Sequence, residues 1–298
     1  MRDDIQWTNL TRQTIASELE ENGFRVSRNI VKQLLDKHDY VKRKAQKSLS
    51  MGHNRNRNGQ FENIARLKQE YGESPNPILS MDTKKKEFLG NFYREGRLYT
   101  RAVIRTYDHD FTSAAQGVII PHGLFDLKRN VGYLYLGTSR DTSEFACDNV
   151  ARWWRGYGRR QYPEAQSLLL LCDSGGSNNA SHSLFKEDLE RVADRLGIAI
   201  RVAHYPPYAS KDNPIEHRLF PHVTRACQGV VFESIDLVGT LMANTRTKTG
   251  LQVFVKIIDR LYMTGREYAK DFKETMRIIF DDRLPKWNYT AMPTALYP

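Results

Sequence analysis

Cysteine is scarce in this sequence, which has three among its 298 residues. Cys147, Cys172 and Cys227 lie far apart and none belongs to a Cys-x-x-Cys pair, which argues against a disulfide framework and against a zinc knuckle. No segment approaches the roughly 20 apolar residues of a membrane helix, and the N-terminal residues lack the apolar core of a signal peptide. We therefore expect a soluble, intracellular protein in a reducing compartment, with no membrane partner.

Acidic residues are absent from Val41 to Gln60, although the whole chain has 35 of them. The basic residues in this stretch are Lys42, Arg43, Lys44, Lys47, Arg55 and Arg57. The chain as a whole is also basic, with a formal net charge of +10 and a pI near 9.4. Solvated lysine faces can make a protein basic, but a local run of one sign favours a polyanionic partner. We expect a linker that follows DNA phosphates.

Two short helices are predicted before this linker. Apolar residues have helical spacing over Thr11–Leu19, and Gly23 can then take the left-handed conformation that ends a helix. Ser27 is a good N-cap for a second helix with an apolar stripe over residues 28–35. The pattern fits a helix-turn-helix, with an ordinary helical hairpin as the structural alternative. The candidate DNA contacts, at the start of the second helix and in the linker, are Arg25, Arg28, Asn29, Lys32, Lys42, Arg43 and Lys44.

The rest of the chain predicts three strands followed by alternating helices and strands. A helix over Phe61–Tyr71 closes the small domain, so we expect a DNA-binding domain and linker over residues 1–72 and a catalytic domain over residues 73–298. The expected strands are Ile78–Met81, Leu98–Tyr107, Val131–Leu136, Ser167–Cys172 and Ile198–Ala203. The expected helices are Thr142–Tyr157, His182–Leu196 and one that begins near Asn213. The order βββ-α-β-α-β-α is that of an RNase H-like mixed α/β sheet.

Three acidic residues fall where this topology brings chain segments together. Asp82 ends the first strand, Asp173 follows the uncharged fourth strand, and Glu216 lies in the first turn of the last helix. Ligands of open α/β sheets bind at such an edge. Carboxylates are hard oxygen ligands that suit Mg²⁺, and two ions about 4 Å apart can activate a nucleophile and stabilise a leaving 3′-oxygen in phosphodiester cleavage.

Each of these acids also has a structural interpretation. Asp82 could form a surface ion pair with the lysines that follow it, and Asp173 could form only a turn. Glu216 follows Asn213 and Pro214 at the third position of a capping-box-like helix start. Other acids compete for the site, namely Asp108, Asp110, Asp126 and Asp212, of which Asp212 is the main alternative third ligand.

The residues around the acids resemble the DDE transposases of Rhodopirellula-type insertion sequences. The similar blocks are Met-Asp82-Thr-Lys-Lys-Lys-Glu-Phe-Leu-Gly, Cys-Asp173-Ser-Gly-Gly-Ser-Asn and Pro-Ile-Glu216-His-Arg-Leu-Phe. The chain departs from the family in having Asp-Asn-Pro where Trp-Asn-Lys is more usual. It also begins almost inside the helix-turn-helix, so we expect an upstream DNA-binding part to be missing.

The resemblance implies an enzyme that cleaves DNA strands and transfers them at the ends of an insertion sequence. It implies that Asp82, Asp173 and Glu216 hold two Mg²⁺ or Mn²⁺ ions. Its partner would be double-stranded DNA, both the terminal inverted repeats of the element and the target DNA, and the chain would assemble with further copies of itself on that DNA. Its location would be the cytoplasm of a prokaryote, at the nucleoid. The alternative is a DNA-binding remnant or a nuclease that only hydrolyses DNA. Further candidate phosphate contacts beside the acids are Lys84, Lys85, Lys211, His217 and Arg218.

Overall fold

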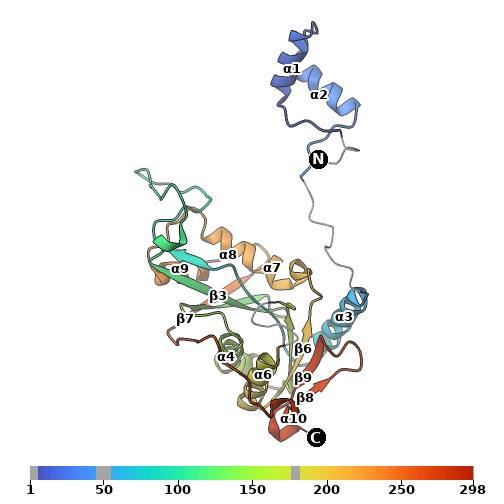
Figure 1. The fold of residues 1–298 in the computed structure, drawn as a ribbon, viewed down its shortest axis with the longest axis vertical. Helices are drawn as coiled ribbons and strands as arrows, with labels where there is room; N and C mark the ends of the chain where they lie inside the picture. The colour runs from blue at the N-terminus through green and yellow to red at the C-terminus, as the bar shows by residue number, and fades with distance from the viewer. Residues whose placement is uncertain (1–5, 45–54, 176–181, 298) are drawn as a thin grey trace. The chain divides into compact units, whose positions relative to one another are not determined.

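The computed structural model describes residues 6–44, 55–175 and 182–297. The chain divides into two compact units, Met1–Ser50 and Met51–Pro298 (Figure 1). The first unit contains α1 (Arg12–Glu21) and α2 (Arg28–Lys37). Their caps are as expected, since Thr11 accepts from the N–H of Thr14 and Ser27 from that of Ile30. Of the basic linker, Lys42, Arg43 and Lys44 are exposed, whereas Lys47 lies outside the described residues.

The helix α3 (Arg57–Glu73) belongs to the second unit. Ile64, Leu67 and Tyr71 on this helix are buried against Leu169 and Leu171 of the sheet. The second unit therefore begins about twenty residues before the expected boundary at residue 73, because the apolar face of α3 is covered by the sheet.

A mixed sheet forms the centre of the second unit, with the strand order β7-β4-β3-β1-β5-β6-β9-β8 and β2 paired with β3. Its strands are β1 (Ile78–Thr83), β2 (Glu87–Leu89), β3 (Gly117–Asp126), β4 (Val131–Gly137), β5 (Ser167–Cys172), β6 (Ala199–His204), β7 (Gln252–Ile258), β8 (Ile278–Phe280) and β9 (Asn288–Ala291). β3 runs antiparallel to β1 and β4, whereas β5 is parallel to both of its neighbours, β1 and β6. This arrangement confirms the predicted RNase H-like fold.

Helices cover both faces of the sheet (Figure 1). One face packs against α4 (Ser143–Trp153) and α6 (Ser183–Leu196), and the other against α7 (Pro214–Arg218), α8 (Phe220–Ala226) and α9 (Ile235–Ala243). After α4 come a π-helical turn (Trp154–Gly158) and the short α5 (Arg159–Gln161), and α10 (Phe272–Thr275) precedes β8. No described helix has the length and apolar character needed to span a membrane.

The expected strand over Leu98–Tyr107 is wrong. This segment has no strand in the structure, and Tyr99 and Val103 are exposed. β-branched and aromatic residues favour strands only where neighbours can pack on them, and this segment has no sheet partner. The strand that occupies the expected position is β3, which contains Pro121 and Gly123, residue types that normally weaken a strand.

Candidate active site

The first two acids of the site lie on neighbouring parallel strands. Met81 of β1 is paired with Cys172 of β5, so the next residue along each strand is an aspartate, Asp82 and Asp173. Adjacent strands are about 4.8 Å apart. The structure therefore brings together two residues that are separated by most of the β-meander and α4 in the sequence.

The third acid is brought to the same edge by contacts at the start of α7. Ser80 of β1 is fully buried, and its hydroxyl oxygen accepts a hydrogen bond from the backbone N–H of Ile215 at 2.9 Å. Asn213 occupies the N-cap position but its side chain does not cap the helix. Its amide nitrogen instead donates to the carbonyl of Met81 at 3.2 Å and to Oδ1 of Asp173 at 3.1 Å. Glu216 is thereby held against both strands.

Glycine on β3 allows α7 and α8 to approach this closely. Gly123 is paired with Asp82, and a Cβ atom there would lie 2.8 Å from side-chain atoms of both Ile215 and Phe220. Even alanine would force the buried side chains of Ile215 and Phe220 to shift. Gly123 lowers the strand propensity of the β3 sequence, but the packing beside the site favours a residue without a side chain at this position.

The electrostatics show that the three carboxylates influence one another. Burial raises the pKa of Asp82 to about 8, with further contributions from the charge of Asp173 and a hydrogen bond with Glu216. Burial also raises the pKa of Asp173 to about 6, although the hydrogen bond from Asn213 opposes the rise. A group of acids whose charged forms are disfavoured by burial and mutual repulsion is one that a cation would stabilise.

The side chains do not form a ready-made metal cage. In the described part of the chain, no three or more His, Cys, Asp or Glu residues are arranged to hold a metal ion. A hydrogen bond with Glu216 contributes to the raised pKa of Asp82, so these two carboxyl groups lie close together. The donor set nevertheless consists of hard carboxylate oxygens, which are the ligands that Mg²⁺ prefers.

The competing acids lie in other surroundings. Asp212 forms an ion pair with Arg57 at 3.8 Å. Asp126 is buried at the far end of β3, where it accepts hydrogen bonds from the hydroxyl of Tyr162 at 2.8 and 2.9 Å. Asp108 and Asp110 lie in an exposed loop. Among the candidates for the third position, Glu216 is the one whose side chain interacts with Asp82.

His204 is a buried residue that contacts the backbone of Asp173. It is fully buried, its Nδ1 lies 2.9 Å from the carbonyl oxygen of Asp173, and its Nε2 lies 2.9 Å from the hydroxyl of Tyr289. Burial lowers the pKa of His204 to about 4, so its ring is neutral at physiological pH. In the structure this histidine orients the backbone of Asp173.

Comparison with known proteins gives the family. A family model described as the Rhodopirellula transposase DDE domain matches residues 1–293. The chain belongs to this transposase family. This confirms the resemblance seen in the sequence. A comparison with curated proteins finds no match.

Solved structures share the fold of the transposase chain. Two structures of Mos1 transposase, a paired-end complex with the left transposon end and a pre-cleavage transpososome, each match at 17% identity with a TM-score of 0.50. Each alignment covers 80% of this chain and 66% of the Mos1 chain. The transposase chain therefore spans slightly less than two thirds of the length of these relatives.

The predicted phosphate-contacting residues near the acids differ in their exposure and in the partners they already have. Lys84 is mostly buried and forms an ion pair with Glu87, which also binds Arg94 at 2.6 Å. Lys85, Lys211 and His217 are exposed. Arg218 donates to Asn130 at 3.2 Å and lies over the ring of Phe125. A hollow of about 480 Å³ beside Glu216 is lined by Lys84, Lys85 and residues of α8.

In the first unit the predicted base contacts are exposed. Arg28 and Asn29 lie in the first turn of α2. Arg25 forms an ion pair with Glu20 at 3.4 Å, and Lys32 with Asp36 at 2.7 Å. Trp153, Trp154 and Trp287 are buried in the second unit, so their rings are packed in the protein and do not offer a surface for base stacking.

Proposed function

We propose that this transposase-family chain cleaves and joins DNA strands at the ends of an insertion sequence, with Asp82, Asp173 and Glu216 as the metal-binding catalytic residues. The observation that carries the proposal is the convergence of the three acids at one sheet edge, where Asp82 interacts with both of the others. The sequence blocks around the three acids, which resemble those of the family, also support it.

The three carboxylates would hold two Mg²⁺ or Mn²⁺ ions, which when bound supply activation of a water or 3′-hydroxyl and stabilisation of the leaving 3′-oxygen. Asn213 orients Asp173 through its amide, and Ser80 fixes the helix that carries Glu216. Lys85 and His217 are exposed, follow closely after Asp82 and Glu216 in the sequence, and would contact phosphates of the DNA.

The partner proposed for this site is double-stranded DNA, first the terminal inverted repeats of the element and then a target. The Mos1 relatives were captured with a transposon end and as a transpososome, which supports this assignment. Because two ends must be joined in one event, we propose that the chain acts as a dimer or larger assembly on DNA. Light scattering of the DNA complex tests this, and a monomer would contradict it.

The decisive experiment uses the full chain with Mg²⁺ or Mn²⁺ and DNA that carries the terminal repeats found around its gene. We expect nicked and joined products from the parent, no products from Asp173→Ala, and products at the parent level from the control Asp212→Asn. Nicking without joining would indicate a hydrolytic nuclease. Binding without any cleavage would indicate a DNA-binding remnant, and equal activity of Asp173→Ala and the parent would exclude the proposed site.

A further inference from the structure

A basic groove lies on the α4 face of the sheet, away from the candidate active site. It consists of two adjoining hollows of about 250 and 480 Å³, which share Arg152, Gly156 and Lys256. Its walls are the end of α4, the π-helical turn and the edge strand β7. The charged residues that line the larger hollow are Arg152, Arg155, Arg195, Lys256, Arg260 and Asp148.

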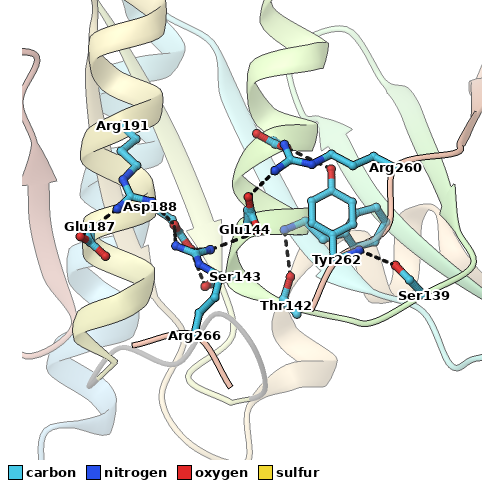
Figure 2. A network of polar contacts seen from close by, with 12 residues as sticks. Ser139, Thr142, Ser143, Glu144, Glu187, Asp188, Arg191, Arg260, Tyr262 and Arg266 are labelled. Atoms are coloured by element: carbon cyan, nitrogen blue, oxygen red, sulfur yellow. Dashed lines mark hydrogen bonds and ion pairs between the residues drawn. The ribbon is translucent and has the colours of Figure 1, made fainter. Parts of the chain in front are cut away.

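The single acid of the groove is already fully engaged. Asp148 accepts from Arg195 at 2.8 Å, from Arg260 at 2.5 Å and from the hydroxyl of Tyr262 at 3.0 Å. Arg260 also reaches Glu144 at the other end of its guanidinium (Figure 2). These pairs fix the groove wall but do not neutralise it, since five cations face one carboxylate of the lining.

Two of the cations have no acidic partner in the part of the chain that the structure describes. The side chain of Arg155 makes only a 3.4 Å contact with the carbonyl of Ala151, and Lys256 has no polar partner there. Both residues are exposed. They are therefore available to an external anion.

A buried tyrosine in the smaller hollow also lacks a partner. Tyr135 is 3% exposed, and its hydroxyl has no hydrogen-bond partner among the described residues. A buried polar group without a partner costs free energy, and burial raises the pKa of Tyr135, which keeps the hydroxyl protonated as a donor. The aromatic rings of Tyr133 and Phe254, stacked 5.7 Å apart, lie beside it.

The helical backbone that lines the groove is irregular. The π-helical turn interrupts the helix at Trp154–Gly158, and such turns are found frequently at functional sites. Gly156 within it faces open space, because a Cβ atom there would meet nothing within 4 Å.

The register of the sheet relates the groove, on the α4 face, to the end of β1 that carries Asp82. Lys256 is paired with Tyr135, Tyr135 with His122, and His122 with Thr83, the residue after Asp82. At about 4.8 Å for each strand, Lys256 lies roughly 14 Å from Thr83 across the sheet.

We propose that this groove binds the phosphate backbone of DNA as a second contact site, separate from the carboxylates that would act on it. The inference rests on the proposed function in taking DNA as the substrate. Arg155 and Lys256 contact phosphate oxygens directly, and the Tyr135 hydroxyl donates a further hydrogen bond. Contacts of this kind position DNA without selecting a base sequence.

Protection from chemical labelling locates the contact. The three native cysteines are buried, so Lys256→Cys gives the full chain one exposed thiol for maleimide, and Arg159→Cys on α5 gives a control outside the groove lining. With saturating duplex DNA of arbitrary sequence, we expect the labelling rate at position 256 to fall at least about fivefold and the rate at position 159 to stay within about twofold. Equal protection at the two positions, or none at either, would overturn the groove.

The salt dependence of DNA binding provides a second measurement on the full chain. Each phosphate contact contributes about 0.9 to the slope of log K against log salt, so Arg155→Gln/Lys256→Gln should lower this slope by about 1.8. The charge-matched control, Arg159→Gln/Lys248→Gln, should leave it unchanged. Equal slopes in the two double variants would refute DNA binding by the groove. Metal-dependent cleavage by the parent would in that case still support the proposed function. A parent that binds no DNA would refute both proposals.

Discussion

The hydroxyl oxygen of Ser80 accepts a hydrogen bond from the backbone N–H of Ile215 at 2.9 Å, which joins the strand of Asp82 to the helix of Glu216. The two residues are 135 positions apart in the sequence. The same hydroxyl donates to the side-chain oxygen of Asn213 at 2.5 Å. One buried serine thus replaces the local N-cap that Asn213 would otherwise supply.

Replacing Ser80 should affect both stability and catalysis. Ser80→Ala leaves the buried amide of Asn213 and the N–H of Ile215 with fewer partners, and we expect a loss of about 1–3 kcal/mol of unfolding free energy. Metal-dependent cleavage should fall as well, because Glu216 loses its anchor. The control is Ser234→Ala at the N-cap of α9, which should cost about 1 kcal/mol and leave cleavage unchanged. Urea unfolding and the cleavage assay separate the two variants.

The cluster of acids predicts how metal should change thermal stability. Burial and the neighbouring carboxylates raise the pKa of Asp82 to about 8, so folding at neutral pH must protonate a carboxyl that is ionised in the unfolded chain. Asp82→Asn removes this cost and should melt above the parent when no metal is present. Mn²⁺ should raise the melting temperature of the parent and of Asp212→Asn, but not that of Asp82→Asn. Differential scanning fluorimetry with and without Mn²⁺ tests this. Equal metal-dependent shifts in all three proteins would place the ion elsewhere.

Local patterns in the sequence were sufficient to predict much of the fold. The uncharged run Ser167–Cys172 indicated a strand buried on both faces, and β5 is a central strand with Asp173 at its end. Ser27 and Gly23 also marked the ends of the first two helices correctly. These features depend on residues close together in the chain, so they can be inferred without tertiary structure.

Features that depend on distant segments could not be predicted in this way. β3 contains Gly123 because α7 packs on it, and that helix lies some ninety residues later in the sequence. The role of Ser80 had one possible signal, a polar residue within an apolar strand, but its partner could not be inferred. The basic groove combines α4, β7 and the segment after β7, and no single stretch of sequence shows it.

Buried histidine predicts a pH dependence of stability. His122 is fully buried without hydrogen-bond partners in the described part of the chain, and burial lowers its pKa to about 3 from 6.5. The unfolded chain therefore binds more protons between these values, so the unfolding free energy falls as the pH falls from about 6.5 toward 3, by up to about 1.4 kcal/mol per pH unit. His122→Phe should flatten this part of the curve, measured by urea unfolding at several pH values. An unchanged slope would show that His122 is not the group responsible.

Two glycines should respond to alanine in opposite directions. Gly96 has φ +141°, and a Cβ atom there would lie 2.6 Å from the backbone nitrogen of Gly229. We expect Gly96→Ala to cost at least about 1–3 kcal/mol through backbone strain. Gly72 lies near the end of α3, where a Cβ atom would meet nothing within 4 Å, and Gly72→Ala should stabilise the chain by about 0.5–1 kcal/mol. Thermal unfolding of the two variants tests the contrast, and a change of the same sign in both would contradict it.

The start of α2 should determine which DNA sequence the chain prefers. Asn29 is exposed in the first turn of that helix, and asparagine can form a bidentate pair with adenine that is worth about 1–3 kcal/mol of discrimination. Asn29→Ala should therefore weaken binding to the terminal repeats while leaving binding to arbitrary DNA nearly unchanged. Lys37→Ala, at the other end of α2, should weaken binding to both DNAs equally if it acts only through charge. Fluorescence anisotropy with the two duplexes gives the ratio of the affinities for terminal-repeat and arbitrary DNA. If this ratio is the same for Asn29→Ala and the parent, the first unit is an ordinary helical hairpin rather than a helix-turn-helix that reads DNA sequence.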